Sequence, residues 1–449
     1  MCSIFITNKT FEDKEQFLEL LEFRGPDLHR EININSVSII HYLLSMTGDT
    51  TPQPIVDGDI VCLFNGEIYN YLEEKQYKSD VYKIIDSYKD HGEDFVKKLD
   101  GEFAIVLIDF AKNCLYMSTD IFGIKPLYFS IENDKFTICT YRKVLANLGC
   151  GNITKCEPNS LYKLDIEDGN IQKLSNVYNF DLKQHKNNFD DWTAAFLSAI
   201  KKRFFGTKWD IILPLSSGHD SGAIACAFNI LNIEYSSFSF THNENKNIIE
   251  DRLTKNMENL CSPGLIHLSN AALHHDERAA ARKILMDRAD FFTYGKDLNY
   301  HDHIHNGYDD PGAHGLTHIL NFIKTINPRT RILASGQGGD EITTNLQSYK
   351  FDKPNPEYFP SDLTKVFPWN NFFYGAQSSY LLKEESVAGA FGIEGRYPFL
   401  DKMVVQEFLW LHEDLKNRYY KSPITNFLIE NNYPHSSGDP KQFKRGFNV

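Results

Sequence analysis

The sequence has no long apolar run, no excess of basic residues and no closely spaced pair of cysteines. Its 449 residues carry 47 Lys and Arg against 60 Asp and Glu, a formal charge of −13. This balance argues against a generally basic nucleic-acid binder and against a basic membrane-surface protein. Without about 18 consecutive apolar residues, no transmembrane helix is predicted. The N-terminus lacks the basic and apolar regions of a signal peptide, so we expect a cytoplasmic protein.

The cysteines are few for this length and widely spaced: Cys2, Cys62, Cys114, Cys139, Cys150, Cys156, Cys226 and Cys261. No two of them form a C-x-x-C pair, which argues against zinc-finger and thioredoxin-type sites. Their low density fits a reducing compartment, where most would be small buried hydrophobic residues. Cys2 is the exception, because removal of Met1 would make it the N-terminal residue.

The length suggests two or three domains, at about 100–200 residues each. Short apolar runs separated by Gly, Asn and Asp predict an antiparallel sandwich in the first third: 4–6, 37–40, 60–64, 103–108, 115–117, 127–129 and 136–138. Helical patterns near 14–21 and 81–89 interrupt these strands. The polar stretch 165–190 is interpreted as a connection between domains.

The second part of the sequence alternates strands with helices. An amphipathic helix is expected near 192–204, and buried strands are expected at 211–215, 235–240 and 331–334. Strands that alternate with helices predict a parallel α/β sheet. Ligands of such sheets bind at the carboxyl ends of the strands.

Small polar residues follow two of these strands. The loop Ser216-Ser-Gly-His-Asp-Ser-Gly222 and the loop Ser335-Gly-Gln-Gly-Gly-Asp-Glu341 both allow backbone N–H groups to approach an anion. Asp220 and Asp340 would repel a phosphate directly, so we expect them to bind Mg²⁺. The first loop alone is equally compatible with an ordinary turn that caps a helix. Two acidic, glycine-rich strand ends together favour a phosphate site.

Ten motifs in order give the sequence a resemblance to one family. They are Met1-Cys-Ser-Ile-Phe5, Arg24-Gly-Pro-Asp27, Asn65-Gly-Glu-Ile-Tyr-Asn70, Ser79-Asp80, Asp100-Gly-Glu-Phe-Ala104, Asp120-x-x-Gly-x-Lys-Pro-Leu-Tyr128, Ser217-Gly-His-Asp-Ser221, Ser335-Gly-Gln-Gly-Gly-Asp-Glu341, Gly392-Ile-Glu-Gly-Arg-Tyr-Pro-Phe-Leu-Asp401 and Lys444-Arg-Gly-Phe447. With this set, the protein resembles the asparagine synthetase type of class II glutamine amidotransferase over nearly its whole length.

The resemblance implies a fold and a reaction. It implies an Ntn-hydrolase-type αββα sandwich at residues 2–180, the glutaminase domain, and a PP-loop ATP pyrophosphatase domain with a parallel sheet at 190–449, the synthetase domain. Glutamine would be hydrolysed in the first domain, and its ammonia would pass through an internal tunnel. The second domain would use ATP and Mg²⁺ to adenylate a carboxylate, release pyrophosphate and form an amide.

In the glutaminase domain, the resemblance makes Cys2 the nucleophile. A thiol with a pKa of about 8.5 needs a base at neutral pH, and the α-amine of Cys2 supplies one on the same residue. The Asn65 side chain and the Gly66 backbone N–H would stabilise the oxyanion. Glu67 and Asp80 would bind the amino end of glutamine.

In the synthetase domain, the resemblance assigns the ATP and pyrophosphate site to Leu215, Ser216, Ser217, Gly218, Asp220, Ser221, Phe240, Ser335 and Gly336. Asp220 and Asp340 would be the metal ligands. Lys444 would stabilise the developing adenylate or pyrophosphate, with a solvated tail lysine as the alternative. The pair Glu394 and Arg396 is interpreted as a structural ion pair near the active site.

Leu43 departs from the family pattern. It stands where the family has an arginine that holds the glutamine α-carboxylate, and leucine cannot make such a bond. Arg24 or His41 would then replace that arginine, or glutamine would bind weakly or not be the donor. Because Cys2, Asn65, Gly66 and Asp80 remain, an active glutaminase is favoured.

Gln337 is the second departure, because asparagine synthetases usually carry glutamate there. A neutral amide cannot act as a general base at neutral pH. We therefore expect an acceptor carboxylate other than aspartate, with Gln337, Asp309 and Asp310 at the acceptor. A nearby histidine cluster is more consistent with solvated or acceptor-lining residues than with a metal site: His301, His303, His305, His314 and His318.

Three functions remain open at this point. The leading one is a glutamine-dependent, AMP-forming amide ligase. The second is an adenylating ligase that forms an amide without glutamine, within or between substrates, as lactam-forming relatives do. The third is a scaffold that keeps only the fold, against which Asp220 and Asp340 argue. The expected partners are small molecules, with no nucleic acid or membrane, and a homodimer is left open.

Overall fold

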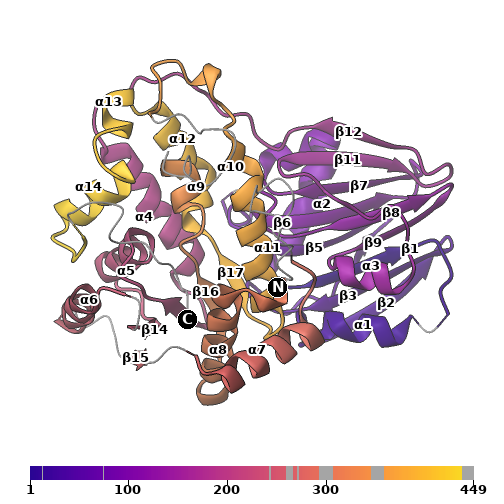
Figure 1. Ribbon diagram of the computed structural model, residues 1–449. Coiled ribbons are helices and arrows are strands. Elements are labelled where there is room, and N and C mark those ends of the chain that lie inside the picture. The colour runs from indigo at the N-terminus through magenta and orange to yellow at the C-terminus, as the bar shows by residue number, and fades with distance from the viewer. Residues whose placement is uncertain are drawn as a thin grey trace. The chain divides into compact units, whose positions relative to one another are not determined.

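The computed structural model describes residues 1–12, 14–73, 75–241, 244–258, 266–269, 273–292, 307–344 and 358–436. The protein divides into two compact units (Figure 1). The first unit consists of Met1–Asn179, Leu285–Phe291 and Ala388–Ile393, and the second consists of Phe180–Ile284, Phe292–Val387 and Glu394–Val449.

Two antiparallel sheets make up most of the first unit. Its strands are β1 (Ser3–Thr7), β2 (Leu28–Ile34), β3 (Val37–Leu43), β4 (Ile55–Asp57), β5 (Ile60–Ile68), β6 (Gly101–Asp109), β7 (Cys114–Thr119), β8 (Tyr128–Glu132), β9 (Lys135–Cys139), β10 (Thr154–Lys155), β11 (Ser160–Asp165) and β12 (Ile171–Ser175). Its helices are α1 (Glu15–Glu22), α2 (Val81–His91), the 3-10 helix η1 (Gly92–Lys98) and α3 (Arg142–Asn147). The strand orders are β10-β8-β9-β1-β3-β2 and β12-β11-β7-β6-β5-β4.

Successive side chains of a strand point to opposite faces of its sheet, and this alternation accounts for the four layers of the unit. Ile4 and Ile6 of β1 point into a core shared by both sheets, whereas Phe5 points to the other side, against α1 and α3. On the outer face of the second sheet, Tyr88 of α2 packs on Tyr116 of β7, with ring centroids 5.4 Å apart. The sheets thus lie face to face, with helices on their outer faces.

The stretch 165–190 does not form one connection. Residues 171–175 form strand β12, which pairs with β11, so the polar residues before it make the turn of a hairpin. Asp165 organises that turn by accepting hydrogen bonds from the backbone N–H groups of Glu167 and Asp168 at 2.8 and 3.3 Å. The expected connection was wrong for this part, because Asp, Asn and Gly favour hairpin turns as well as linkers.

The second unit contains a parallel sheet and most of the helices. Its strands are β13 (Asp210–Pro214), β14 (Ser236–Phe240), β15 (Ile266–Ser269), β16 (Thr330–Ala334) and β17 (Glu394–Arg396). Its helices are α4 (Asp190–Phe204), α5 (His219–Leu231), α6 (Lys246–Glu258), α7 (His275–Arg288), η2 (Gly307–Asp309), α8 (Pro311–Ile326), α9 (Gly339–Thr343), η4 (Leu363–Lys365), α10 (Asn370–Phe373), α11 (Gly375–Gly389), η5 (Pro398–Leu400), α12 (Lys402–Trp410), α13 (Glu413–Lys416) and α14 (Ser422–Glu430). The ends of α7 and α11 belong to the first unit.

The strand order β15-β14-β13-β16-β17 places a switch point between β13 and β16. All of these neighbours pair in parallel. The two loops predicted to bind phosphate follow β13 and β16, so they leave adjacent strands at the same sheet edge. The prediction of a mixed α/β protein with antiparallel and parallel sheets is confirmed. Across the described residues, no helix is long and apolar enough to cross a membrane.

Candidate active site

Cys2 lies in a pocket of the first unit, which we call the thiol pocket. Its lining residues are Cys2, Leu43, Leu44, Ser45, Met46, Thr47, Asp49, Thr51, Gln53, Phe64, Gly66, Glu67, Ser79 and Asp80. The pairing of β1 with β3 sets Ser3 opposite Tyr42, which brings the N-terminal residues beside Leu43 and Leu44. The Cys2 thiol is 3.8 Å from the carbonyl oxygen of Leu44. The pocket therefore joins the N-terminal end to loops that follow β3 and β5.

Asn65 and Gly66 stand next to the thiol on β5. The backbone nitrogen of Cys2 donates to Oδ1 of Asn65 at 2.8 Å, and the Asn65 side chain is fully buried. Its Nδ2 has no hydrogen-bond partner within the described part of the protein. Gly66 has φ +130, and a Cβ there would overlap the carbonyl of Glu102 on β6. A buried donor that lacks an acceptor is costly, so this pair is suited to a ligand oxygen.

Carboxylates supply the charge of the thiol pocket. Oδ2 of Asp80 accepts from the Ile68 N–H at 3.1 Å, and Glu67 accepts from the hydroxyl of Thr47. Asp49 also lines the pocket, and no Lys, Arg or His does so among the residues that the structure describes. Glu67 and Asp80, the two residues predicted to bind the amino end of glutamine, thus lie in the same pocket as Cys2.

The two residues considered as replacements at Leu43 lie outside the pocket lining. Arg24 is fully buried; its Nε donates to the carbonyl of Cys2 at 3.0 Å, and its guanidinium lies over Tyr141. His41 is buried as well, with Nε2 3.2 Å from the carbonyl of Phe64. Burial lowers the pKa of His41 to about 4, so the ring is neutral at pH 7.

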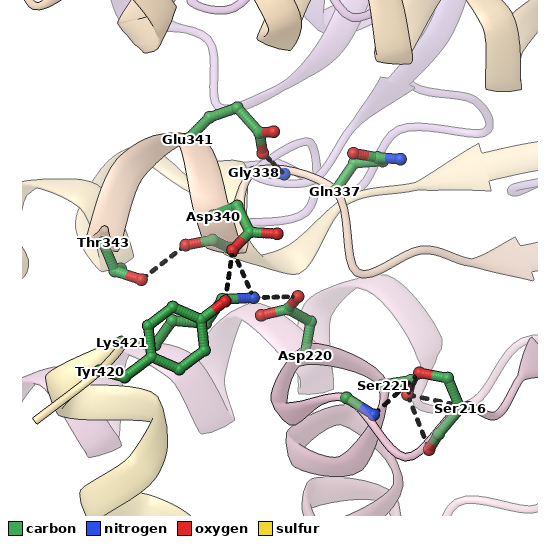
Figure 2. A network of polar contacts seen from close by, with 12 residues as sticks. Ser216, Asp220, Ser221, Gln337, Gly338, Asp340, Glu341, Thr343, Tyr420 and Lys421 are labelled. Carbon is green, nitrogen blue, oxygen red and sulfur yellow. Dashed lines mark hydrogen bonds and ion pairs between the residues drawn. The ribbon is translucent and has the colours of Figure 1, made fainter. Parts of the chain in front are cut away.

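In the second unit, the loop after β13 is ordered by its own hydroxyls. Oγ of Ser221 accepts from the Ser216 N–H at 3.1 Å and lies 2.8 Å from Ser216 Oγ (Figure 2). Gly218 is the residue that precedes α5, and its N–H donates to Ser216 Oγ at 3.2 Å. Asp220 lies in the first turn of α5 instead of capping it, which removes the ordinary-cap interpretation of this loop.

Two charged side chains from the next helical segment hold this loop. Glu244 accepts hydrogen bonds from the Ser217 hydroxyl and, at 2.8 Å, from the Ser217 N–H. Arg252 of α6 donates from Nη1 to the carbonyls of Ser216 and Gly218 at 2.5 and 2.9 Å. A Cβ at Gly222 would overlap the guanidinium of Arg252, so a larger residue at this position would displace that side chain.

The loop after β16 packs on Asp220. A Cβ at Gly336 would lie 2.8 Å from the Asp220 Cβ, and one at Gly339 would overlap the Asp220 carboxylate. These glycines therefore allow Asp220 to approach the second loop. From the sequence, they were predicted to let an anionic ligand approach the backbone instead. Gly338, with φ +91, makes the left-handed turn into α9.

A lysine joins the two predicted metal ligands. The Lys421 ammonium forms ion pairs with Asp220 and, at 2.9 Å, with Asp340, whose Oδ1 also accepts from the Tyr420 hydroxyl at 3.0 Å (Figure 2). We call Asp220, Asp340, Tyr420 and Lys421 the carboxylate cluster. Burial opposes the charge on Lys421, but Asp220, Tyr420 and Glu341 together outweigh it and raise the pKa of the ammonium. Lys421 has φ 49, a left-handed conformation that side chains other than Asn rarely adopt.

The donors of the carboxylate cluster fit a magnesium ion. Mg²⁺ prefers carboxylate oxygens, and both carboxylates converge on one point, the Lys421 nitrogen. Oδ1 of Asp220 is buried and has no hydrogen-bond partner in the described residues, so it remains available to a cation.

Gln337 has a carboxylate beside it that comes from α11. Its Nε2 donates to Oε1 of Glu384 at 3.0 Å, and Ser335 Oγ donates to Oε2 at 2.5 Å. Burial raises the pKa of Glu384, and these two hydrogen bonds oppose the rise. The amide at position 337 is thus paired with a glutamate from another element.

The remaining predicted residues take no part in the contacts described above. Asp309 pairs with Arg282 at 2.5 Å, and Asp310 caps α8 by accepting from the Ala313 N–H at 2.7 Å. Leu215 and Phe240 are buried. The expected ion pair of Glu394 and Arg396 is present at 2.8 Å. Lys444, His301, His303 and His305 lie outside the described residues, and no group of three metal-binding side chains occurs within them.

Comparison with known proteins places this geometry in a family. Residues 1–180 match the model of the glutamine amidotransferase domain. The asparagine synthetase [glutamine-hydrolyzing] of Asparagus officinalis is 26% identical over 433 residues, which cover 90% of this protein and 68% of that one. The enzyme of the same name from Gallus gallus is 24% identical, with 93% and 78% covered. Residues 1–180 are thus a glutamine amidotransferase domain, and the similarity over most of the length supports an asparagine synthetase-type class II amidotransferase.

Asparagine synthetase [glutamine-hydrolyzing] 1 of Saccharomyces cerevisiae is 25% identical to this amidotransferase over 451 residues. The match covers 90% of this protein and 75% of the yeast one. Sequence patterns did not predict the part that four charged residues of the second unit play in the site: Glu244, Arg252, Glu384 and Lys421. Only Lys421 carried a usable signal, because Ser422-Pro423 marks a helix start and places Lys421 at its cap.

Proposed function

We propose that this amidotransferase is a glutamine-hydrolysing amide ligase with two coupled half-reactions. Residues 2–180 would release ammonia from the side-chain amide of glutamine. Residues 190–449 would use that ammonia to amidate a carboxylate activated by ATP. The observation that carries the proposal is the unpartnered Nδ2 of the buried Asn65, whose Oδ1 accepts from the backbone nitrogen of Cys2.

In the first half-reaction, the Cys2 sulfur attacks the carbonyl carbon of the glutamine δ-amide. After removal of Met1, the α-amine of Cys2 is the base that accepts the thiol proton. The bond from the Cys2 nitrogen to Asn65 Oδ1 fixes the amide orientation, so Nδ2 and the Gly66 N–H are left to bind the oxyanion. The C–N bond breaks, ammonia leaves, and water hydrolyses the thioester to the γ-carboxylic acid.

In the second half-reaction, the loop from Ser216 to Ser221 would bind the pyrophosphate part of ATP with its N–H and hydroxyl groups. Asp220 and Asp340 would hold Mg²⁺, which neutralises phosphate charge when bound. The acceptor carboxylate attacks the α-phosphorus and pyrophosphate leaves. Ammonia then attacks the acyl-adenylate and AMP is released. Lys421 holds both carboxylates in place before the metal binds, and Lys444 remains the candidate for stabilising the adenylate.

Glu384 is the base that Gln337 cannot be. The attacking nitrogen must lose a proton as the amide forms, and the carboxylate next to Gln337 can accept it. Gln337 then orients Glu384 through the 3.0 Å hydrogen bond and presents an amide to the acceptor. An amide in place of the usual carboxylate supports an acceptor other than aspartate.

Isotope labelling tests the whole proposal. The protein is incubated with ATP, Mg²⁺, glutamine labelled with ¹⁵N at its δ-amide, and a panel of carboxylic acids that includes aspartate. The expected product is an amide that carries the label, with AMP and pyrophosphate in equal amounts. Release of AMP with an unlabelled amide would refute the glutamine half, and efficient asparagine formation at low aspartate would refute the acceptor assignment.

A further inference from the structure

Ser217, a buried residue of the loop after β13, directs both of its hydrogen-bond donors to a carboxylate of the protein itself. Its backbone N–H donates to Oε2 of Glu244 at 2.8 Å, and its hydroxyl donates to the same oxygen. Glu244 lies just before α6, so the contact joins positions 27 residues apart. An anionic oxygen that accepts from a backbone N–H and a hydroxyl at a strand end of small residues has the surroundings of a bound phosphate oxygen.

The proposed function assigns these same donors to the pyrophosphate part of ATP. A carboxylate oxygen and a phosphate oxygen are both anionic acceptors, and Ser217 offers one N–H and one hydroxyl hydrogen. The two anions cannot share these donors, since like charges a few ångströms apart repel strongly in a partly buried site. Glu244 and pyrophosphate are therefore alternative occupants of the loop.

Neighbouring groups stabilise the carboxylate in this position. The Asn245 N–H donates to the hydroxyl oxygen of Ser217 at 3.3 Å, which ties the segment before α6 to the loop a second time. Burial raises the pKa of Glu244, and the hydrogen bonds from Ser217 and the positive charge of Arg252 oppose the rise. These contacts favour a carboxylate in the loop while no phosphate is bound.

Arg252 of α6 contacts the loop in a way that a phosphate does not disturb. Its Nη1 donates to the carbonyl oxygens of Ser216 and Gly218, and its Nε donates to the carbonyl of Pro434 at 2.9 Å. Carbonyl oxygens are acceptors and do not bind phosphate oxygens, so ATP would leave these bonds intact. Arg252 thus anchors α6 to the loop, and only the side chain of Glu244 has to move.

We propose that Glu244 is a displaceable occupant of the phosphate loop, which holds the donors of Ser217 until the pyrophosphate part of ATP takes its position. This inference rests on the proposed function of the second unit. The binding free energy of ATP then includes the cost of moving the carboxylate out of the loop. Return of Glu244 to Ser217 after the reaction competes with pyrophosphate and favours its release.

Calorimetric titration of the full-length protein with magnesium pyrophosphate, ATP and AMP tests the proposal. Glu244→Gln removes the charge of the occupant, and Glu244→Ala removes the occupant itself. Both should lower the Kd for pyrophosphate and ATP, by about tenfold in the alanine variant if about one loop in ten is free of the carboxylate. The Kd for AMP, which lacks the pyrophosphate part, should change by less than about twofold. Unchanged or weaker pyrophosphate binding in the folded variants would overturn the inference.

Hydrogen exchange of the wild type provides a measurement that needs no variant. Saturating magnesium pyrophosphate should speed amide exchange at 245–249, because the first turn of α6 loses its contact with Ser217 when Glu244 leaves. Unchanged or slower exchange there, with pyrophosphate bound, would also overturn the inference.

Glu250→Gln is the matched control. It removes an equal charge from an exposed position of α6, where Glu250 pairs with Lys246 at 3.6 Å, and should leave the Kd values unchanged. Equal tightening in Glu250→Gln and Glu244→Gln would show a general charge effect and overturn the inference. Failure of the wild type to bind either ATP or pyrophosphate would instead refute the proposed function of the second unit.

Discussion

The two candidate sites treat buried carboxylates in opposite ways. In the thiol pocket of the first unit, Glu67 and Asp80 face a ligand space that no Lys, Arg or His lines among the described residues. In the carboxylate cluster of the second unit, Lys421 forms ion pairs with both Asp220 and Asp340. The carboxylates of the first site are predicted to bind the amino end of glutamine, whereas those of the second already contact a lysine of the protein.

The two sites differ in the source of the positive charge that balances their carboxylates. In the thiol pocket, the Ile68 N–H and the Ser79 hydroxyl donate to Asp80, and the Thr47 hydroxyl donates to Glu67. In the carboxylate cluster, Lys421 neutralises the charge before ATP and Mg²⁺ bind. Binding of the metal then becomes an exchange of one cation for another. The left-handed backbone of Lys421 is the strain accepted for this arrangement.

The largest expected effect tests whether the two sites work separately. Cys2→Ser should lower glutamine-dependent amide formation by about a thousandfold or more, because serine is a far poorer nucleophile without a dedicated base. Amide formation from added ammonium salts should continue near the wild-type rate. Both rates are measured by AMP release. Loss of the ammonia-dependent reaction as well would show that the sites are not separable in this way.

The second-largest effect is expected on the stability of the folded protein when the cation of the carboxylate cluster, Lys421, is removed. Lys421→Met leaves Asp220 and Asp340 without their countercharge, and breaking a buried ion pair costs about 3–5 kcal/mol. Thermal or denaturant unfolding should show this loss. Added Mg²⁺ should then stabilise Lys421→Met more than the wild type, because the metal no longer competes with the ammonium.

The control for that measurement is Lys201→Met, which changes an exposed lysine of the same unit. It should leave both the unfolding midpoint and the response to Mg²⁺ unchanged. An equal Mg²⁺ effect in Lys421→Met and wild type would mean that the metal binds somewhere other than the carboxylate cluster.

Local sequence signals could place the groups that follow strands. The loops that begin at Ser216 and Ser335 were predicted at strand ends, because small residues after a buried run can be recognised in the sequence. Cys2, Asn65 and Gly66 were grouped by the resemblance to a known family instead. The structure brings both loops to adjacent strands. The parallel sheet itself followed from the alternation of strands and helices.

Local sequence signals could not predict contacts between residues that lie far apart in the sequence. Lys421 meets Asp220 from 201 residues away, and Glu384 meets Gln337 from 47 residues away. A lysine near a helix start or a glutamate within a helix carries no pattern that names its partner. The need for glycine at position 222 is of the same kind, because the guanidinium of Arg252 reaches it from α6, a different helix.

Glu384 provides a test within the second site that separates chemistry from charge balance. Glu384→Gln keeps the shape of the side chain, with its oxygen accepting from Gln337 and its NH₂ able to donate to the Ser335 hydroxyl oxygen, but removes the base. Amide formation should therefore fall by about a hundredfold while ATP–pyrophosphate exchange continues. Because burial raises the pKa of Glu384 above the usual 4.5, the wild-type rate should fall as pH drops through that raised pKa. The variant should lack this acidic limb. An equal loss of both half-reactions would assign Glu384 a structural role instead.

The smallest effect concerns the packing that shapes the phosphate loop. Gly222→Ala places a methyl group against the guanidinium of Arg252, which must then release the carbonyls of Ser216 and Gly218. Such overpacking costs about 1–3 kcal/mol and should raise the KM for ATP severalfold. Arg252→Leu alone should also weaken ATP binding, because the loop carbonyls lose their donor. In the double variant the methyl group no longer meets a guanidinium. The loss of ATP affinity in the double variant should therefore be smaller than the sum of the losses in the two single variants. Strictly additive losses would mean that Arg252 and Gly222 act on the loop independently, and the explanation of the glycine would fail.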